Sequence, residues 1–244
     1  METHTCKNCG NIFQGNYCNN CGQPAHAHPI NTQFVMHDLR HGLFHVDGGL
    51  LYSAKQLFLR PGHTVREYIE GKRAKHYKPF SMVIVTASFY GVLYHLLEID
   101  LFRTVDDTFN HEQLNGWIAH YYAFITLALI PVVSLASYLM FRRSGYNFVE
   151  HMVLNSFYSC QKLAVRIVLL PLFLLIPDQY FRALLNSFFL LDLLLMCWTY
   201  SQFFRPGNHV NIFLRTLLSY VLALLLSGTL IAIVLAVLAV AKVL

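Results

Sequence analysis

The sequence predicts an all-α membrane protein, with about five transmembrane helices preceded by a small zinc ribbon and by amphipathic interfacial helices. Three observations lead to this fold class. Of the 244 residues, 55% are hydrophobic and 13% are charged, whereas about 25% of the residues of a soluble domain are usually charged. Long hydrophobic runs follow the first third of the chain, and half of the basic residues lie within that third. Two closely spaced cysteine pairs lie near the N-terminus, before the hydrophobic runs and before most of the basic residues.

Composition changes along the chain predict three segments. Residues 1–25 form the predicted zinc ribbon, because they hold the two cysteine pairs. Residues 26–79 form a basic amphipathic juxtamembrane segment, since apolar and polar residues alternate there without a run long enough to span a bilayer. Residues 80–244 form the transmembrane helical domain.

The ribbon is predicted from two Cys-x-x-Cys knuckles, which are separated by eight residues and are each followed by a glycine. The ligands are Cys6, Cys9, Cys18 and Cys21. Each knuckle brings two thiolates onto one face, and the glycine permits a backbone twist that a side chain would resist. Four protein thiolates leave no open coordination position, so the metal is expected to be structural and to supply folding free energy. Zinc is the predicted ion, iron is an alternative, and redox dithiols or disulfides are the competing interpretation.

The juxtamembrane segment is expected to lie along the membrane surface as amphipathic helices. Its basic residues, among them Lys72 and Arg73, are suited to anionic lipid head groups, which attract such segments. Recognition of a phosphate-bearing ligand or of nucleic acid is the alternative. Nucleic acid is not favoured, because the same charges are those that set membrane topology.

A histidine stripe lies in this segment, where His37, His41 and His45 recur every four residues. This spacing places the three side chains on one helical face, with Asp38 beside them. Imidazole binds zinc, iron and copper, so the stripe is a candidate second metal site and the basis of a membrane metalloenzyme hypothesis. Histidines that hydrogen-bond lipid head groups are the alternative.

Five apolar stretches are long enough to cross a bilayer. The predicted spans are about 80–97, 117–141, 151–176, 180–203 and 212–241. The third is the weakest, because Lys162 and Arg166 interrupt it, and four spans are therefore an alternative. His151, near the start of this span, is expected to be solvated at the interface.

Basic residues indicate the orientation of the spans. They cluster before the first span and recur after the second, at Arg142 and Arg143, whereas the connection 98–116 is mostly acidic. Because short basic loops stay on the cytoplasmic side, we expect a cytoplasmic N-terminus and an external C-terminus. Thiolates that bind metal are typical of a reducing compartment, which agrees with this orientation.

Three turns resemble one another, at 58–65, 203–210 and, more loosely, 141–145. Each places an arginine after an aromatic residue or leucine and before a glycine. The arginines are Arg60, Arg143 and Arg205. Convergence on a common interfacial turn is one explanation, because arginine reaches from the lipid boundary to phosphates. The other is a shared site for a phosphate or lipid head group, to which Lys72 and Arg73 would contribute.

Charged residues inside the spans form the last candidate site. Lys162 and Arg166 lie one helical turn apart, and Asp192 lies near the middle of the fourth span. An unpaired charge there costs about 2.5–3.5 kcal/mol on insertion scales, so we expect a cross-span ion pair. The pair either locks two helices together or lines a route for a substrate, and the second interpretation predicts a polar cavity among spans three to five.

The ribbon at 6–23, Leu-Arg-Pro-Gly at 59–62 and the Gly-Lys-Arg to Pro-Phe box at 71–80 together resemble a bacterial zinc-ribbon, multi-pass membrane family classed as a domain of unknown function. The resemblance covers residues 6 to about 90, and His76 departs from it where an aromatic residue is common. It implies a location in the bacterial cytoplasmic membrane and brings no activity with it.

The sequence favours a non-enzymatic membrane protein whose ribbon and basic segment form a cytoplasmic docking platform or an accessory subunit of a membrane complex. We expect membrane lipids and a protein partner, or self-association, as its contacts. One alternative is a transporter or lipid-handling protein that uses Lys162, Arg166 and Asp192. Another is the metalloenzyme of the histidine stripe. No Ser-His-Asp order, Walker loop or dinucleotide fingerprint supports other enzyme classes.

Overall fold

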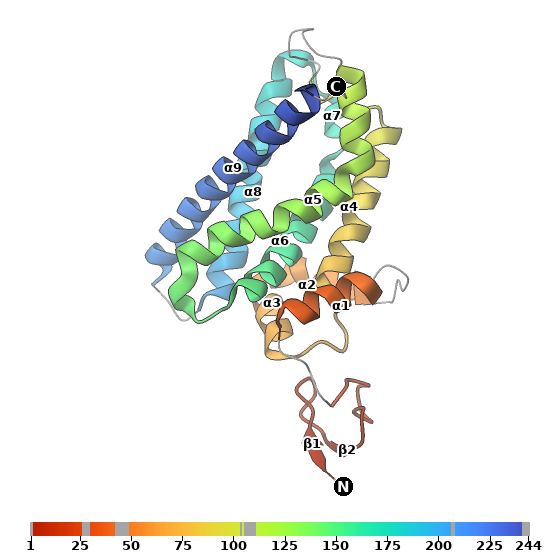
Figure 1. Cartoon of the computed structure of the whole chain (residues 1–244), viewed down its shortest axis with the longest axis vertical. Helices are drawn as coiled ribbons and strands as arrows, with labels where there is room; N and C mark the ends of the chain where they lie inside the picture. The colour runs from red at the N-terminus through yellow and green to blue at the C-terminus, as the bar shows by residue number, and fades with distance from the viewer. Residues whose placement is uncertain are drawn as a thin grey trace.

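The computed structural model describes residues 2–25, 30–41, 49–102, 104, 111–205 and 208–240. In chain order the elements are β1 (Thr3–Thr5), β2 (Ile12–Gln14), α1 (Thr32–His41), α2 (Gly49–Leu59), α3 (Pro61–Glu70), α4 (Pro79–Leu96), α5 (His111–Phe141), η1 (Arg142–Ser144), α6 (Phe148–Leu169), α7 (Leu172–Leu175), α8 (Asp178–Phe203) and α9 (His209–Val240). Figure 1 shows the β1–β2 hairpin as a small lobe at one end, the helices α1 to α3 beside it, and the long helices extending away.

The predicted all-α membrane fold is confirmed. Within the described residues, five helical segments are long and apolar enough to cross a membrane. They are Pro79–Leu96, Gln113–Ser144, Phe148–Leu175, Asp178–Phe203 and His209–Val237. The third segment is therefore as long as a span requires despite its charges, which removes the reason for preferring four spans. The last described turns of α9 lie at the end of the bundle opposite the ribbon (Figure 1).

Close packing holds the long helices together on the side of α4. This helix packs against both α5 and α6. At Gly91 the backbones of α4 and α5 approach so closely that an added Cβ would lie 2.8 Å from the carbonyl oxygen of Ala119. The helix α5 contains Pro131, and it bends along its length (Figure 1), because proline removes one hydrogen bond from a helix interior. Its second half packs against α9.

Helices form in the segment predicted to be interfacial, and their apolar residues pack on the bundle. Helix α1 contacts α4, α2 contacts α6, and α3 contacts α8 and α6. Leu57 of α2 and Val65 and Tyr68 of α3 are buried in the main hydrophobic core. Burial of such side chains stabilises the docked position by about 1.5–3 kcal/mol each. Positive charge alone would predict a looser, purely electrostatic attachment.

Asp38 fixes α1 on the start of α4. Its Oδ2 atom accepts a hydrogen bond from the Phe80 N–H at 3.2 Å, and its Oδ1 atom accepts one from the Ser81 hydroxyl at 2.7 Å. The first N–H groups of a helix have no partner within the helix, and a carboxylate there also interacts favourably with the helix dipole. Asp38 therefore acts as a cap supplied by another helix.

Gly62 and Arg66 fix α3 on the end of α8. The Gly62 N–H donates to Oε1 of Gln202 at 3.1 Å. The guanidinium of Arg66 donates to the carbonyl oxygens of Gln202 and Phe203, which are among the last of α8. The last carbonyl oxygens of a helix receive no hydrogen bond from the helix itself, so a cationic donor is favoured there.

Candidate functional site

The ribbon consists of two knuckles with the same backbone geometry. The Gly10 N–H donates to the carbonyl oxygen of Cys6 at 2.9 Å, and the Gly22 N–H donates to that of Cys18 at 2.8 Å. Both glycines have positive φ angles, +75° and +73°. Residues with a Cβ rarely adopt this conformation, so the glycine that follows each cysteine pair is required by the turn, as the spacing predicted.

The four ribbon thiols gather at one point. The Sγ atoms of Cys6, Cys9, Cys18 and Cys21 all lie within 4.8 Å of one another. The Sγ–Sγ distances are 3.5 Å between Cys6 and Cys21 and 3.6 Å between Cys9 and Cys18. A tetrahedral ion with metal–sulfur bonds of about 2.3 Å separates its ligands by about 3.8 Å. The thiols are free rather than joined in disulfides, so the donor set and its size fit a tetrahedral metal ion.

The surroundings favour thiolate at some of the four sulfurs. Burial raises the pKa of the Cys18 thiol, but the backbone N–H groups of Asn20 and Cys21 oppose it and lower that pKa to about 6. The backbone N–H of Gln23 lowers the pKa of Cys21. Burial raises the pKa of Cys6 to about 11. The second knuckle is thus prepared for metal, and a bound cation would complete deprotonation of the first.

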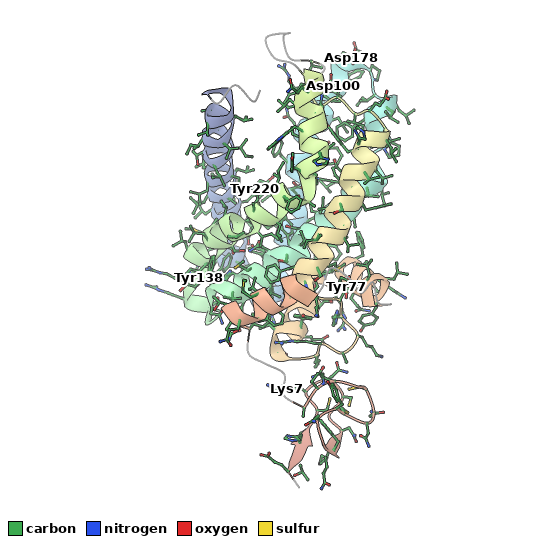
Figure 2. The ribbon with its side chains drawn as sticks, turned by 45° about the vertical axis from the view of Figure 1, so that its right-hand side comes forward. Lys7, Tyr77, Asp100, Tyr138, Asp178 and Tyr220 are labelled. Atoms are coloured by element: carbon green, nitrogen blue, oxygen red, sulfur yellow. The ribbon has the colours of Figure 1, made fainter. Side chains whose placement is uncertain are left out.

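Gln23 attaches the ribbon to the turn between α3 and α4. Its side-chain amide donates to the carbonyl oxygen of Gly71 at 2.8 Å. Its Oε1 atom accepts from the N–H groups of Arg73 and Ala74 at 3.0 and 3.1 Å. Gln23 is 3% exposed, so these bonds are shielded from water. In Figure 2 the ribbon lobe, marked by Lys7, lies directly beyond this end of the bundle, marked by Tyr77.

The basic residues of the Gly-Lys-Arg box contact protein groups. The guanidinium of Arg73 lies over the rings of Phe34 and Tyr68, at 5.2 and 5.3 Å from their centroids. It also donates to the carbonyl oxygen of Tyr68 at 3.0 Å, and burial lowers its pKa. Lys72 lies 3.5 Å and Arg60 3.1 Å from carboxylate oxygens of Glu67.

The three similar turns meet through their aromatic residues and one glycine. Phe141 stacks on Phe204 with ring centroids 3.9 Å apart, and Gly62 lies against the backbone at Phe203. Their arginines differ in environment, because Arg60 is paired whereas Arg143 and Arg205 are exposed. These contacts explain why the turns share aromatic residues. A shared phosphate site stays a prediction.

The histidine stripe is described in part. His37 and His41 lie in α1, but their side chains, and His45 altogether, lie outside the described residues, so the second metal site stays a prediction. Asp38, expected beside the stripe, is bound by the start of α4. Within the part of the chain that the structure describes, the ribbon cysteines are the group of metal-ligating side chains found close together.

A charge cluster lies where α6 faces α8. Oδ2 of Asp192 is 2.5 Å from Nη2 of Arg166 and 3.9 Å from Nζ of Lys162. Asp192 is 5% exposed. The Tyr158 hydroxyl donates to the carbonyl oxygen of Asp192 at 2.8 Å, and Nζ of Lys162 lies 5.7 Å from the centroid of the Tyr158 ring. The cluster contains one carboxylate and two cations, so it carries a net charge of +1.

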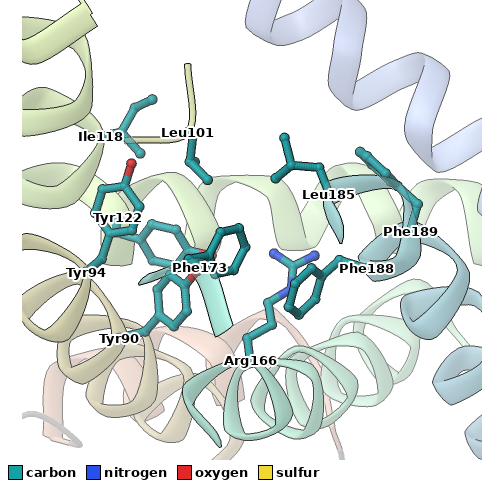
Figure 3. Close-up of a pocket in the computed structure, with 10 residues that line it drawn as sticks. All are labelled: Tyr90, Tyr94, Leu101, Ile118, Tyr122, Arg166, Phe173, Leu185, Phe188 and Phe189. Carbon is teal, nitrogen blue, oxygen red and sulfur yellow. The ribbon is translucent and has the colours of Figure 1, made fainter. Parts of the chain in front are cut away.

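Two cavities adjoin this cluster. The larger, of about 380 Å³, lies between α5, α6, α8 and α9 and is lined by Lys162, Arg166 and Asp192 together with mostly apolar residues. The smaller, of about 170 Å³, is lined by aromatic residues and by Arg166 (Figure 3). The transport hypothesis predicted a polar cavity among spans three to five. The larger cavity lies there, with α5 as an additional wall, but most of its lining is apolar.

A buried polar network was missed by the sequence analysis. His151 is fully buried rather than solvated, and its Nδ1 lies 2.9 Å from the Ser137 hydroxyl. Asn155 donates to Ser137 at 3.0 Å and accepts from the Tyr200 hydroxyl at 2.8 Å. The expectation failed because α5 and the end of α8 cover this end of α6. The spacing of His151 and Asn155, four residues apart on one helical face, was the available signal.

Comparison with known proteins gives one match. Residues 47–91 match a family model described as "protein of unknown function (DUF3667)". The segment contains α2, α3 and most of α4, with the motifs at 59–62 and 71–80. The resemblance to a family of unknown function is therefore confirmed, with the ribbon outside the matched range. No curated protein and no solved structure matches the chain.

Proposed function

We propose that the protein is an accessory subunit that presents a metal-organised ribbon as a docking platform on the cytoplasmic side of a membrane complex. The observation that carries this proposal is the attachment of the ribbon through Gln23 to the Gly71–Ala74 turn. A ribbon on a flexible linker would sample many positions. This ribbon is held in one.

The attachment continues from the turn to the spans. The turn follows α3, and α3 is docked on α8 through Gly62 and Arg66. The ribbon is thereby fixed relative to the membrane domain, which is what a platform for one partner requires. Fixing the orientation in advance lowers the entropy cost of binding.

The exposed face of the ribbon indicates the kind of partner. Ile12 and Tyr17 are 70% and 66% exposed, although the lobe is small. Large side chains with few rotatable bonds are the usual anchors of protein interfaces. We therefore propose a protein partner with an apolar pocket, rather than a nucleic acid.

The proposed orientation places the ribbon in the cytoplasm of a bacterium. The ribbon side of the first span carries Lys72, Lys75 and Lys78, and such basic segments remain cytoplasmic. Metal-binding thiolates are also typical of a reducing compartment. Zinc is the proposed ion, because its borderline-soft character suits four thiolates, and when bound it supplies folding free energy to the lobe.

Photo-cross-linking in native membranes tests the platform. A photoreactive phenylalanine analogue replaces Ile12 or Tyr17, and Leu51 of α2, which is 79% exposed, serves as the control position. The same identified protein is expected as an adduct from both ribbon positions. That adduct should be absent from position 51 and lost in Gln23→Ala. Adducts with lipid alone, or adducts that persist in Gln23→Ala, contradict a fixed platform.

Metal analysis of the purified protein tests the ribbon against the metalloenzyme hypothesis. One equivalent of zinc per chain is expected, and Cys9→Ser combined with Cys18→Ser should remove it. Replacing His37 and His41 by alanine should leave the content unchanged. A second equivalent that survives the cysteine changes and disappears with the histidine changes would favour the metalloenzyme.

A further inference from the structure

We propose that the larger cavity, between α5, α6, α8 and α9, binds a phospholipid whose head group carries one negative charge, with its phosphate at Lys162. This site is independent of the platform on the ribbon side. It rests on the composition of the charge cluster, on the walls of the cavity and on its depth in the bundle.

The net charge of the cluster indicates that the ligand of the cavity is an anion. Asp192 forms its short contact with Arg166, and Lys162 lies farther away, at 3.9 Å. One carboxylate thus neutralises one of the two cations, and the excess positive charge resides near Lys162. The side chain of Lys162 remains 27% exposed and lines the cavity. Its ammonium has three donors, and a monoanionic phosphate diester would neutralise the cluster.

The remaining walls of the cavity favour an apolar chain on that anion. Apart from the cluster, the lining from α5 and α9 is largely aliphatic, with Leu129, Val133, Leu224 and Ile231 among its members. Helix α9 is the least covered span, with 6% of its most apolar window buried. Figure 2 shows it apart from α5 at the end away from the ribbon. Lipid therefore borders the cavity from the side.

The depth of the cluster separates this site from ordinary lipid contacts. Asp192 lies eleven residues before the end of α8 at Phe203. At 1.5 Å per residue this is about 16 Å, roughly half of a hydrocarbon core of about 30 Å. A phosphate at Lys162 would lie far below the surface head groups. Its binding should be insensitive to salt that screens surface charges.

Native mass spectrometry of the full-length protein in detergent tests the site. Phosphatidylglycerol is the monoanionic probe, and phosphatidylcholine is the zwitterionic comparison. One phosphatidylglycerol is expected to bind at least tenfold more tightly, and the preference should persist when the salt concentration rises from 0.15 to 0.5 M. A photoreactive acyl chain on the same lipid should label peptides of α5 or α9. Equal affinity for the two lipids, or labelling confined to other helices, overturns the proposal.

Matched variants locate the phosphate. Lys162→Gln should reduce the preference for phosphatidylglycerol to less than twofold, and Lys162→Arg should retain it. Arg215→Gln removes a cation from α9 that does not line the cavity, and it should leave the preference unchanged. An unchanged preference in Lys162→Gln, measured on protein with the wild-type melting temperature, refutes the role of Lys162.

Competition distinguishes the lipid from other occupants. Inorganic phosphate at 20 mM should not displace the lipid, since it has no chain for the aliphatic wall. Displacement would show a site for free phosphate and would overturn the lipid assignment. A stable dimer without bound lipid would instead show that a second copy covers α9, which also overturns it.

Discussion

Replacing Gly62 by alanine should detach α3 from α8. An added Cβ would lie 2.2 Å from the carbonyl oxygen of Thr199 and 2.5 Å from Phe203 N. Because ordinary contact begins near 3.4 Å, α3 would have to withdraw by roughly 1.2 Å. That shift would lengthen the 3.1 Å bonds of the Gly62 N–H and of Arg66 beyond hydrogen-bonding distance. Overpacking and the loss of a charged hydrogen bond together cost about 3 kcal/mol.

Hydrogen–deuterium exchange of α3 measures this cost. A loss of about 3 kcal/mol corresponds to a roughly 100-fold decrease in amide protection. Gly228→Ala is the matched control, because nothing lies within 4 Å of a Cβ at Gly228. The control should be neutral or more stable by about 0.5–1 kcal/mol, since alanine is the better helix former. Wild-type protection of α3 in Gly62→Ala would refute the close approach of the two helices.

Three further predictions follow from other contacts. Gln23→Ala should raise amide exchange in the Gly71–Ala74 turn by about 10-fold or more while the metal content of the protein stays unchanged. Gln14→Ala, at an exposed ribbon position, should alter neither. Burial lowers the pKa of His76 from 6.5 to about 4, so the neutral ring stabilises the fold above pH 6.5 and this stability is lost progressively as the pH falls toward 4. Melting temperatures should therefore decline more steeply with acid in the wild type than in His76→Phe, and parallel declines would exclude His76 as the cause. Asp192→Asn should destabilise the bundle by about 3–5 kcal/mol in chemical unfolding, because Arg166 loses its partner. A loss of about 1 kcal/mol or less, as for an exposed ion pair, would show that the carboxylate is not the centre of the cluster.

Local spacing and hydrophobic length predicted much of the architecture. The ribbon could be predicted because its ligands and glycines are contiguous in sequence, so the required geometry is local. The spans could be predicted because a bilayer demands long apolar stretches. The third span looked weak because hydropathy along a single helix counts Lys162 and Arg166 as full penalties, even though an ion pair with Asp192 was expected. Asp192, on another helix, neutralises one of these two charges across the interface between α6 and α8.

Interactions between distant segments could not be predicted in this way. Gln23 was unremarkable in sequence, yet it joins the ribbon to a turn about fifty residues away. Asp38 was placed beside a histidine stripe on grounds of helical spacing, but it caps α4. A polar side chain can form hydrogen bonds with many different groups, and tertiary packing determines which of these groups lies close to it. Hydrophobic periodicity carries no signal for that choice.

Each contact that fixes the ribbon relative to the spans has one partner within the segment 47–91 and one partner outside it. Gly62 and Arg66 dock α3 on α8, and the Gly71–Ala74 turn receives Gln23. The charge cluster around Asp192 lies outside this segment. The matched segment therefore holds the turn that receives the ribbon and the helix that docks on α8, whereas Gln23 and Gln202 belong to other parts of the chain. In this chain the matched segment thus belongs to the ribbon side of the bundle, whereas the larger cavity is lined entirely by residues outside that segment.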